Sequence, residues 1–223
     1  MKKRSNPSRK EFPLKKIIPL VAVALLSACA RDGEIDQTGG IAITRTACPA
    51  VAIPAQTGDI TVFNPASSRD ARAIDITANI TNLRMNCGGQ GENVVAEASF
   101  SIEARRTSTV GARTVELPYF ATVVRGGTVV VSKRVERVSI NFADGQARAS
   151  TTAKGGAVIN RVAATLPADV RAKLTRKRRA DDVDASIDPL SAPDVRAAVQ
   201  RASFELLIGF QLTADQLQYN ATR

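Results

Sequence analysis

Apolar and polar residues alternate along several segments of this chain, and this period of two constrains the fold more than any other feature. Residues 74–80 alternate isoleucine or alanine with Asp, Thr and Asn, and residues 94–105 and 204–212 repeat the pattern. Successive side chains of an extended strand point to opposite faces, so each segment predicts a strand with one buried and one polar face. We therefore expect a mainly β protein.

Glycine-containing turns separate the predicted strands. Gly88-Gly89-Gln90-Gly91 follows the first strand, Gly126-Gly127 lies between two apolar runs, and Asp144-Gly145 follows the second of those runs. Gly-Gly and Asp-Gly pairs supply the positive φ angles that tight hairpin turns require. Short turns between successive strands predict an antiparallel meander.

A second layer has to cover the apolar face of such a sheet, so the expected architecture is a β-sandwich. Short segments at 41–46 and 59–63 would supply additional strands. Curling of the sheet into a barrel-like closure is the alternative.

The C-terminal third predicts short helices on either side of a final strand. Pro167-Ala168-Asp169 suits the first turn of a helix. Ser191 is expected to cap a second short helix over 194–201, and Thr213 with Gln216 has capping-box spacing for a last helical turn. We expect the final strand to rejoin the main sheet.

The first 28 residues have the composition of an export signal. Seven Lys and Arg side chains against one Glu lie in 1–16, and residues 17–28 carry no charged side chain. Twelve helical residues span only about 18 Å, too short for a bilayer core of roughly 30 Å but suitable for a signal peptide. Removing the basic segment lowers the net charge from +10 to +4, so nucleic acid is not an expected partner.

Leu26-Ser27-Ala28-Cys29 resembles the lipobox of bacterial lipoproteins, in which an aliphatic residue and two small residues precede a cysteine. The resemblance covers residues 1–29 only. It implies removal of residues 1–28, attachment of a diacylglyceryl group to Cys29, and acylation of the new amine by a fatty acid such as palmitate. Two or three acyl chains anchor a protein firmly to a bilayer.

The same resemblance indicates a compartment. Ala30 follows the cysteine where Asp would be linked with retention in the inner membrane, so the outer membrane, facing the periplasm, is expected. Inner-membrane anchoring is one alternative. Cleavage at Ala28-Cys29-Ala30 by an ordinary signal peptidase, which would release a soluble periplasmic protein, is another. Residues 29–40 then form a lipidated tether, and residues 41–223 a single mainly β domain.

Two cysteines remain once Cys29 is assigned to lipid. Cys48 and Cys87 are expected to form a disulfide in an oxidising periplasm. The loop of about 40 residues that they close corresponds to roughly 4 kcal/mol of stabilisation. Their separation does not suit a redox-active or metal-binding pair.

The absence of histidine removes the Ser-His-Asp and Cys-His hydrolases and the histidine zinc sites. The leading hypothesis is a non-enzymatic binding or envelope-structural module that needs no cofactor. Its partner would be a protein or an anionic envelope polymer. The alternative is a hydrolase or carbohydrate-active enzyme that uses Asp and Glu carboxylates alone.

Arg176, Lys177, Arg178 and Arg179 form the densest basic run of the chain. The run is a candidate contact with anionic lipid head groups or envelope polymers. The alternative is a solvated helix end whose charge the following aspartates offset.

Alternating oxygen-bearing side chains follow that run, at Asp182, Asp184, Ser186 and Asp188. The spacing matches the first half of a calcium-binding loop, but Ile187 and Pro193 occupy the positions that require Gly and Glu. A polar linker is therefore expected here, and no metal site.

Overall fold

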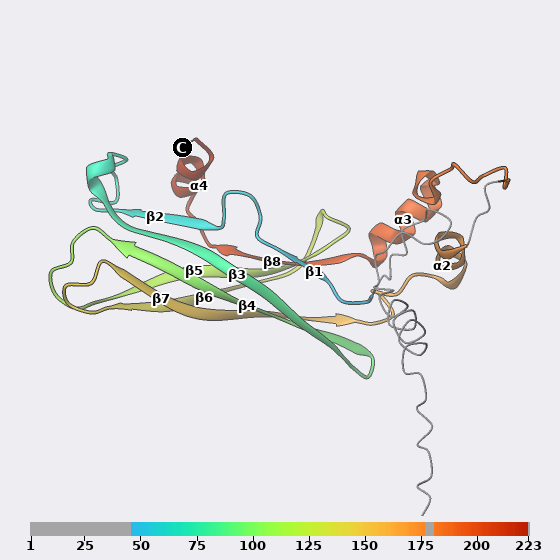
Figure 1. Cartoon of the computed structure of the whole chain (residues 1–223), viewed down its shortest axis with the longest axis horizontal. Coiled ribbons are helices and arrows are strands. Elements are labelled where there is room, and N and C mark those ends of the chain that lie inside the picture. The colour runs from blue at the N-terminus through green and yellow to red at the C-terminus, as the bar shows by residue number, and fades with distance from the viewer. Residues whose placement is uncertain (1–45, 177–180, 223) are drawn as a thin grey trace, which may run out of the picture.

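The structure, a computed structural model of the chain, describes residues 46–176 and 181–222, and it confirms the expected mainly β fold (Figure 1). Of the two additional strands expected, the one at 59–63 is observed, whereas residues 41–45 lie outside the described residues. The strand at 148–160 has no counterpart among the expected segments. The strands are β1 (Ala50–Ala52), β2 (Asp59–Phe63), β3 (Ile74–Gln90), β4 (Asn93–Arg106), β5 (Arg113–Arg125), β6 (Val129–Phe142), β7 (Arg148–Asn160) and β8 (Phe204–Phe210).

These strands form two four-stranded sheets. The first has the order β1-β8-β5-β6 and the second the order β2-β3-β4-β7. All neighbouring strands are antiparallel except β1 and β8, which pair in parallel from Ala50 opposite Glu205 to Ala52 opposite Leu207. The final strand β8 thus joins a main sheet, as the sequence predicts.

The predicted hairpins are present, but the meander is interrupted between them. Gly91 (φ 57°) lies in the β3–β4 turn, and Gly126 (φ 61°) and Gly127 (φ 77°) form the β5–β6 turn. The Asp144-Gly145 turn joins β6 to β7, which belong to different sheets, and the β4–β5 connection also changes sheet. Two long hairpins with one apolar face each bury those faces by stacking, and a continuous single sheet would leave them exposed.

The main core lies between the two sheets and is built from branched aliphatic, alanine and aromatic side chains. The alternating positions of β3, β4, β5 and β8 point into it, so the period of two in the sequence becomes the inward face of each strand. Its fully buried members include Ile76, Phe100, Ile102, Leu117, Ile140, Phe142, Leu206, Ile208 and Phe210.

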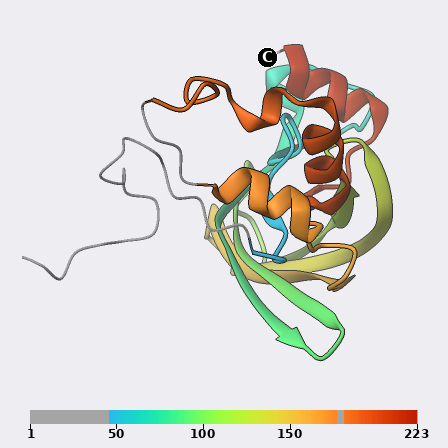
Figure 2. The same cartoon turned by 90° about the vertical axis from the view of Figure 1, so that its right-hand side faces the viewer.

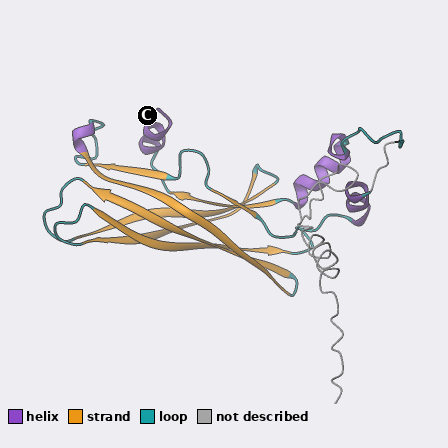
Figure 3. Ribbon diagram, viewed as in Figure 1, coloured by secondary structure: helices purple, strands orange, loops and turns teal. Residues whose placement is uncertain are grey.

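Helices lie at both ends of the strands (Figure 3). At one end, α2 (Ala168–Thr175), the 3₁₀ turn η3 (Pro189–Ser191) and α3 (Pro193–Ala202) pack around the buried Val170, Val195 and Ala198. We call this the helical end, and Figure 2 views the molecule from it. The other end, which we call the far end, carries the 3₁₀ turn η2 (Ala71–Ala73), and α4 (Ala214–Thr222) lies against β2 toward that end.

Two of the predicted helix starts can be compared with the observed ones. The capping box is confirmed, since the Gln216 amide donates to Thr213 Oγ1 and the Thr213 amide donates to Gln216 Oε1. The Ser191 cap is wrong: Ser191 ends η3, and Ala192 precedes α3 without a side-chain cap. Pro193, which needs no N–H partner, takes the first helical position. Within the described residues, no helix has the length and apolarity to cross a bilayer.

One buried arginine organises the loops at the far end. Arg106 is 2% exposed and donates to four main-chain carbonyl oxygens, those of Thr109, Gly111, Ala143 and Gln146, at 2.7–2.9 Å. Its guanidinium also lies 5.3 Å from the centre of the Phe142 ring. The side chain thereby fixes the β4–β5 connection against the β6–β7 turn.

Candidate functional site

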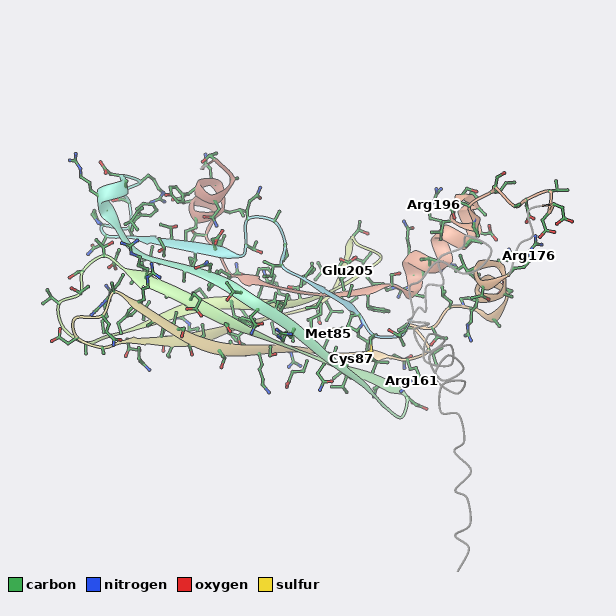
Figure 4. All side chains as sticks on the ribbon, in the orientation of Figure 1. Met85, Cys87, Arg161, Arg176, Arg196 and Glu205 are labelled. Atoms are coloured by element: carbon green, nitrogen blue, oxygen red, sulfur yellow. A yellow bond between two sulfur atoms is a disulfide. The ribbon has the colours of Figure 1, made fainter. Side chains whose placement is uncertain are left out.

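The edges of the two sheets are candidate binding sites, because an edge strand presents unpaired N–H and C=O groups. The edge strands are β1 and β6 in one sheet and β2 and β7 in the other. β1 has only three residues, and Cys48 just before it forms the predicted disulfide with Cys87, which is labelled in Figure 4. That edge is short and covalently held.

The edge of β2 is covered by the C-terminal helix. Asn220 Nδ2 on α4 donates to the carbonyl oxygen of Asp59 at 2.8 Å, and Gln216 Nε2 donates to that of Thr61 at 3.3 Å. Phe63 and Tyr219 add an edge-to-face ring contact with centroids 5.1 Å apart. Side-chain amides therefore take the place of a neighbouring strand along β2.

The edges of β6 and β7 meet at the Asp144-Gly145 turn, and a tyrosine links them farther along. The Tyr119 hydroxyl lies 2.7 Å from Glu136 Oε2 on β6 and 2.9 Å from the Lys154 carbonyl oxygen on β7. Burial, followed by the hydrogen bond with Glu136, raises the pKa of Tyr119 well above its usual value, so the hydroxyl stays protonated. Tyr119 therefore bridges β6 and β7 near the middle of both strands.

Beyond that link, β6 is exposed. Val129, Val130, Val131 and Val135 are 53–61% exposed, and the remaining side chains between 129 and 137 are exposed as well. In the second half of the same strand, alternate residues from Val138 onward are buried against the core. We call residues 129–137 the open edge, because no described strand pairs with its outer side.

The open edge carries a net positive charge. Lys133, Arg134 and Arg137 outnumber Glu136, and Glu136 is engaged by Tyr119. Lys133 Nζ lies 5.1 Å from the centre of the Phe120 ring, and Arg137 makes a long, exposed ion pair of 3.7 Å with Glu116. Exposed valine and cationic side chains therefore lie along a strand that pairs with β5 on one side and with no described strand on the other.

Two shallow cavities, both widely open to solvent, adjoin the start of the open edge at the helical end. Their volumes are about 190 and 420 Å³, and both are lined by Arg125 at the end of β5 and Arg201 on α3. The larger one also contacts Thr128, Val129 and Gln200. Neither cavity has an Asp or Glu side chain in its wall.

The structure places only part of the predicted basic run. Arg176, labelled in Figure 4, is exposed and pairs with Asp184 at 2.5 Å and with Asp182 at 3.6 Å. Lys177, Arg178 and Arg179 lie outside the described residues, as does Cys29. The aspartates that follow the run therefore offset the charge of Arg176.

The calcium-like spacing does not assemble a metal site. Asp182 and Asp184 face Arg176, and Asp188 Oδ1 accepts a hydrogen bond from the Leu190 amide at the start of η3. Among the residues that the structure describes, no group of three or more His, Cys, Asp or Glu side chains is arranged to hold a metal ion.

Sequence reasoning did not identify the open edge, Tyr119 or the pair Arg125 and Arg201. The run Val129-Val130-Val131 reads as a core strand, and only the strand order shows that it lies at an edge. No family model, no curated protein and no solved structure matches this chain.

Proposed function

We propose that this chain is a lipid-anchored protein of the outer membrane, facing the periplasm, whose β body binds another protein without catalysis. The open edge carries the proposal. The edge of β1 is short and that of β2 is covered by α4, whereas no described strand pairs with the outer side of β6 or of β7. Of these last two strands, β6 carries the run of exposed valines and cations at residues 129–137.

The partner that fits this edge is an extended acidic segment of a protein. An added strand would pair with the outer N–H and C=O groups of β6, and main-chain hydrogen bonds would supply much of the affinity. Val131, Lys133 and Val135 occupy alternating positions and so share one face. A segment that alternates apolar with Asp or Glu residues would match that face.

Charged residues on an edge also have a purely protective role, since they discourage pairing between copies of a protein. The two roles differ in their effect on a partner. Under the protective role, loss of Lys133 and Arg134 leaves partner binding unchanged. Under the proposed role, reversal of these charges weakens it.

The anchor is supported by the residues of the N-terminus and by the disulfide. Leu26-Ser27-Ala28-Cys29 supplies the lipobox pattern, and a Cys48–Cys87 bond suits an oxidising compartment such as the periplasm. The alternative function, hydrolysis by two carboxylates, requires both groups to converge on one cavity. The cavities at Arg125 and Arg201 have walls without carboxylates.

Photocrosslinking in intact cells tests the open edge. A photoreactive amino acid at Val131 or Val135 should give a discrete crosslinked product, whereas the same group at Glu103, exposed on the central strand β4, should give none. Lys133→Glu with Arg134→Glu should lower the yield at Val131 at least fivefold, while Arg72→Glu at the far end should not. Mass spectrometry of the product should identify an extended acidic segment.

Equal crosslinking from Glu103, or a yield that is insensitive to the double charge reversal, would contradict binding at this edge. The anchor has its own test. Cys29→Ser, or treatment with globomycin, should block processing and shift the protein out of its membrane fraction. Unchanged processing and fractionation would overturn the anchor and leave the open edge as a separate question.

A further inference from the structure

We infer that the cavities lined by Arg125 and Arg201 bind the phosphate groups of anionic phospholipids and so set the helical end of the molecule against the membrane. In the cell this inference rests on the proposed anchor, which supplies the membrane. The binding surface shares only Val129 with the open edge, and it can be tested without the lipid.

The two arginines are held in place by the contact between the β5–β6 turn and α3. The Gly126 amide donates to the Ser203 carbonyl oxygen at 2.9 Å, directly after α3. A Cβ atom on Gly126 would lie only 3.1 Å from the Gln200 carbonyl oxygen, so the close approach depends on glycine. Arg125 on β5 and Arg201 on α3 therefore line shared cavities on a fixed frame.

Two other cations at the helical end are paired with aspartates, whereas Arg125 and Arg201 are not. At the helical end, Lys173 pairs with Asp194 at 2.8 Å and Arg176 pairs with Asp184. Arg125 and Arg201 make no ion pair with any described residue. Guanidinium groups bind phosphate oxygens through two parallel hydrogen bonds, which favours phosphate as the ligand.

Apolar side chains flank the cationic cavities. Val129 lines the larger cavity and is 60% exposed, and Val162, next to a residue that lines the smaller one, is 79% exposed. Cationic groups beside exposed apolar ones suit the boundary between lipid head groups and acyl chains. A free phosphate ion would make no use of these valines.

The chain also enters the fold at this end. β1, just after Cys48, pairs with the start of β8, which directly follows α3. Residues 30–45 separate the proposed lipid from the first described residue and reach at most about 55 Å. A tether of that length keeps the local lipid concentration high and so strengthens, in the cell, the binding that the two arginines provide.

Vesicle binding by the unlipidated mature chain, residues 29–223 with Cys29→Ser, tests the inference. Every strand and both disulfide cysteines lie within this chain. It should bind vesicles of phosphatidylcholine with 30% phosphatidylglycerol and bind pure phosphatidylcholine vesicles much more weakly. Arg125→Gln with Arg201→Gln should weaken binding roughly 25-fold, since each cation near an anionic surface contributes about fivefold. Arg72→Gln with Arg105→Gln, an equal charge change at the far end, should change binding less than twofold.

A second measurement reports orientation without altering the arginines. An environment-sensitive dye on Thr128→Cys, at the β5–β6 turn, should shift to the blue on the anionic vesicles, and the dye on Ser108→Cys, about 45 Å away along the strands, should not. Equal binding by the two double variants, or equal dye shifts, would overturn the inference. Saturable binding of inorganic phosphate without vesicle binding would also overturn it, since the ligand would then be a free ion.

Discussion

Arg113 on β5 and Asp75 on β3 join the two sheets through a bidentate pair, Nη1 to Oδ1 and Nη2 to Oδ2, each at 2.7 Å. The Asp75 side chain is 14% exposed. Hydrogen bonds from Arg113 lower the pKa of Asp75, in spite of the opposing effect of burial. The carboxylate is therefore stabilised in the folded protein relative to the unfolded chain.

This pair predicts a dependence of stability on pH. Because the folded pKa of Asp75 lies below the unfolded value of about 3.9, its contribution is fully present above that value and is lost as pH falls through the folded pKa. Asp75→Asn should lower the free energy of unfolding by about 1 kcal/mol at pH 7, and by progressively less as the pH falls below about 3.9. Urea denaturation over this range measures the difference. Glu116→Gln, which breaks a long exposed pair, should have little effect at any pH in this range; a pH-independent loss in Asp75→Asn would contradict the argument.

The hydrogen bonds of Arg106 predict a large loss of stability on its substitution, although the residue lies far from both proposed binding surfaces. Arg106→Met removes the donors to four carbonyl oxygens and should lower the free energy of unfolding by about 3 kcal/mol. Arg105→Met, on the exposed face of the same strand, should change it by less than about 0.5 kcal/mol. Chemical denaturation of the two variants provides the comparison. Equal stabilities would mean that water replaces the guanidinium without cost.

The disulfide predicts sensitivity to reducing agents. Cys48 and Cys87 are separated by 39 residues, and opening such a loop should cost about 2–4 kcal/mol of stability. Thermal unfolding of the unlipidated mature chain should shift to lower temperature on addition of dithiothreitol. The Cys48→Ala, Cys87→Ala double variant should unfold at that lower temperature with or without the reductant. A reductant effect that persists in the double variant would have another origin.

The close packing around Gly155 predicts that this position of β7 does not accommodate a larger side chain. A Cβ atom there would lie 2.7 Å from Ile208 Cδ1 and 2.9 Å from Ala121 Cβ in the opposite sheet. Gly155→Ala should therefore lower the free energy of unfolding by about 1–3 kcal/mol through overpacking. Gly88→Ala, where a Cβ meets nothing within 4 Å, is the matched control and should not destabilise. Comparable denaturation midpoints for the two variants would show that the sheets move apart freely.

The same glycine explains why sequence patterns found most strands but missed β7. Strands such as β4 and β8 alternate large apolar with polar residues, and their period is plain. The inward positions of β7 include Ala153, Gly155 and Ala157, which are too small to stand out against their polar neighbours. These residues are small because the opposite sheet lies close to β7. The distance between the sheets depends on the tertiary structure, so no local sequence pattern reveals it.

The candidate sites, too, were only partly predictable from the sequence. The disulfide followed from counting cysteines, since one of the three was assigned to the lipobox. The open edge did not follow, because its valines become exposed only through the order of strands in the sheet. Arg125 and Arg201 are 76 positions apart, and no local pattern links them before α3 packs against the β5–β6 turn.

The position of Cys48 determines how the body would respond to a mechanical pull on its N-terminus. β1 is held by three residue pairs with β8, and a strand pulled from its end separates one pair at a time. The Sγ–Sγ bond to Cys87 lies ahead of β1, so tension is passed into the long β3–β4 ladder before it reaches those pairs. With the disulfide intact, a pull on the N-terminus stretches many hydrogen bonds between β3 and β4 at once. Once the disulfide is reduced, the same pull separates β1 from β8 first.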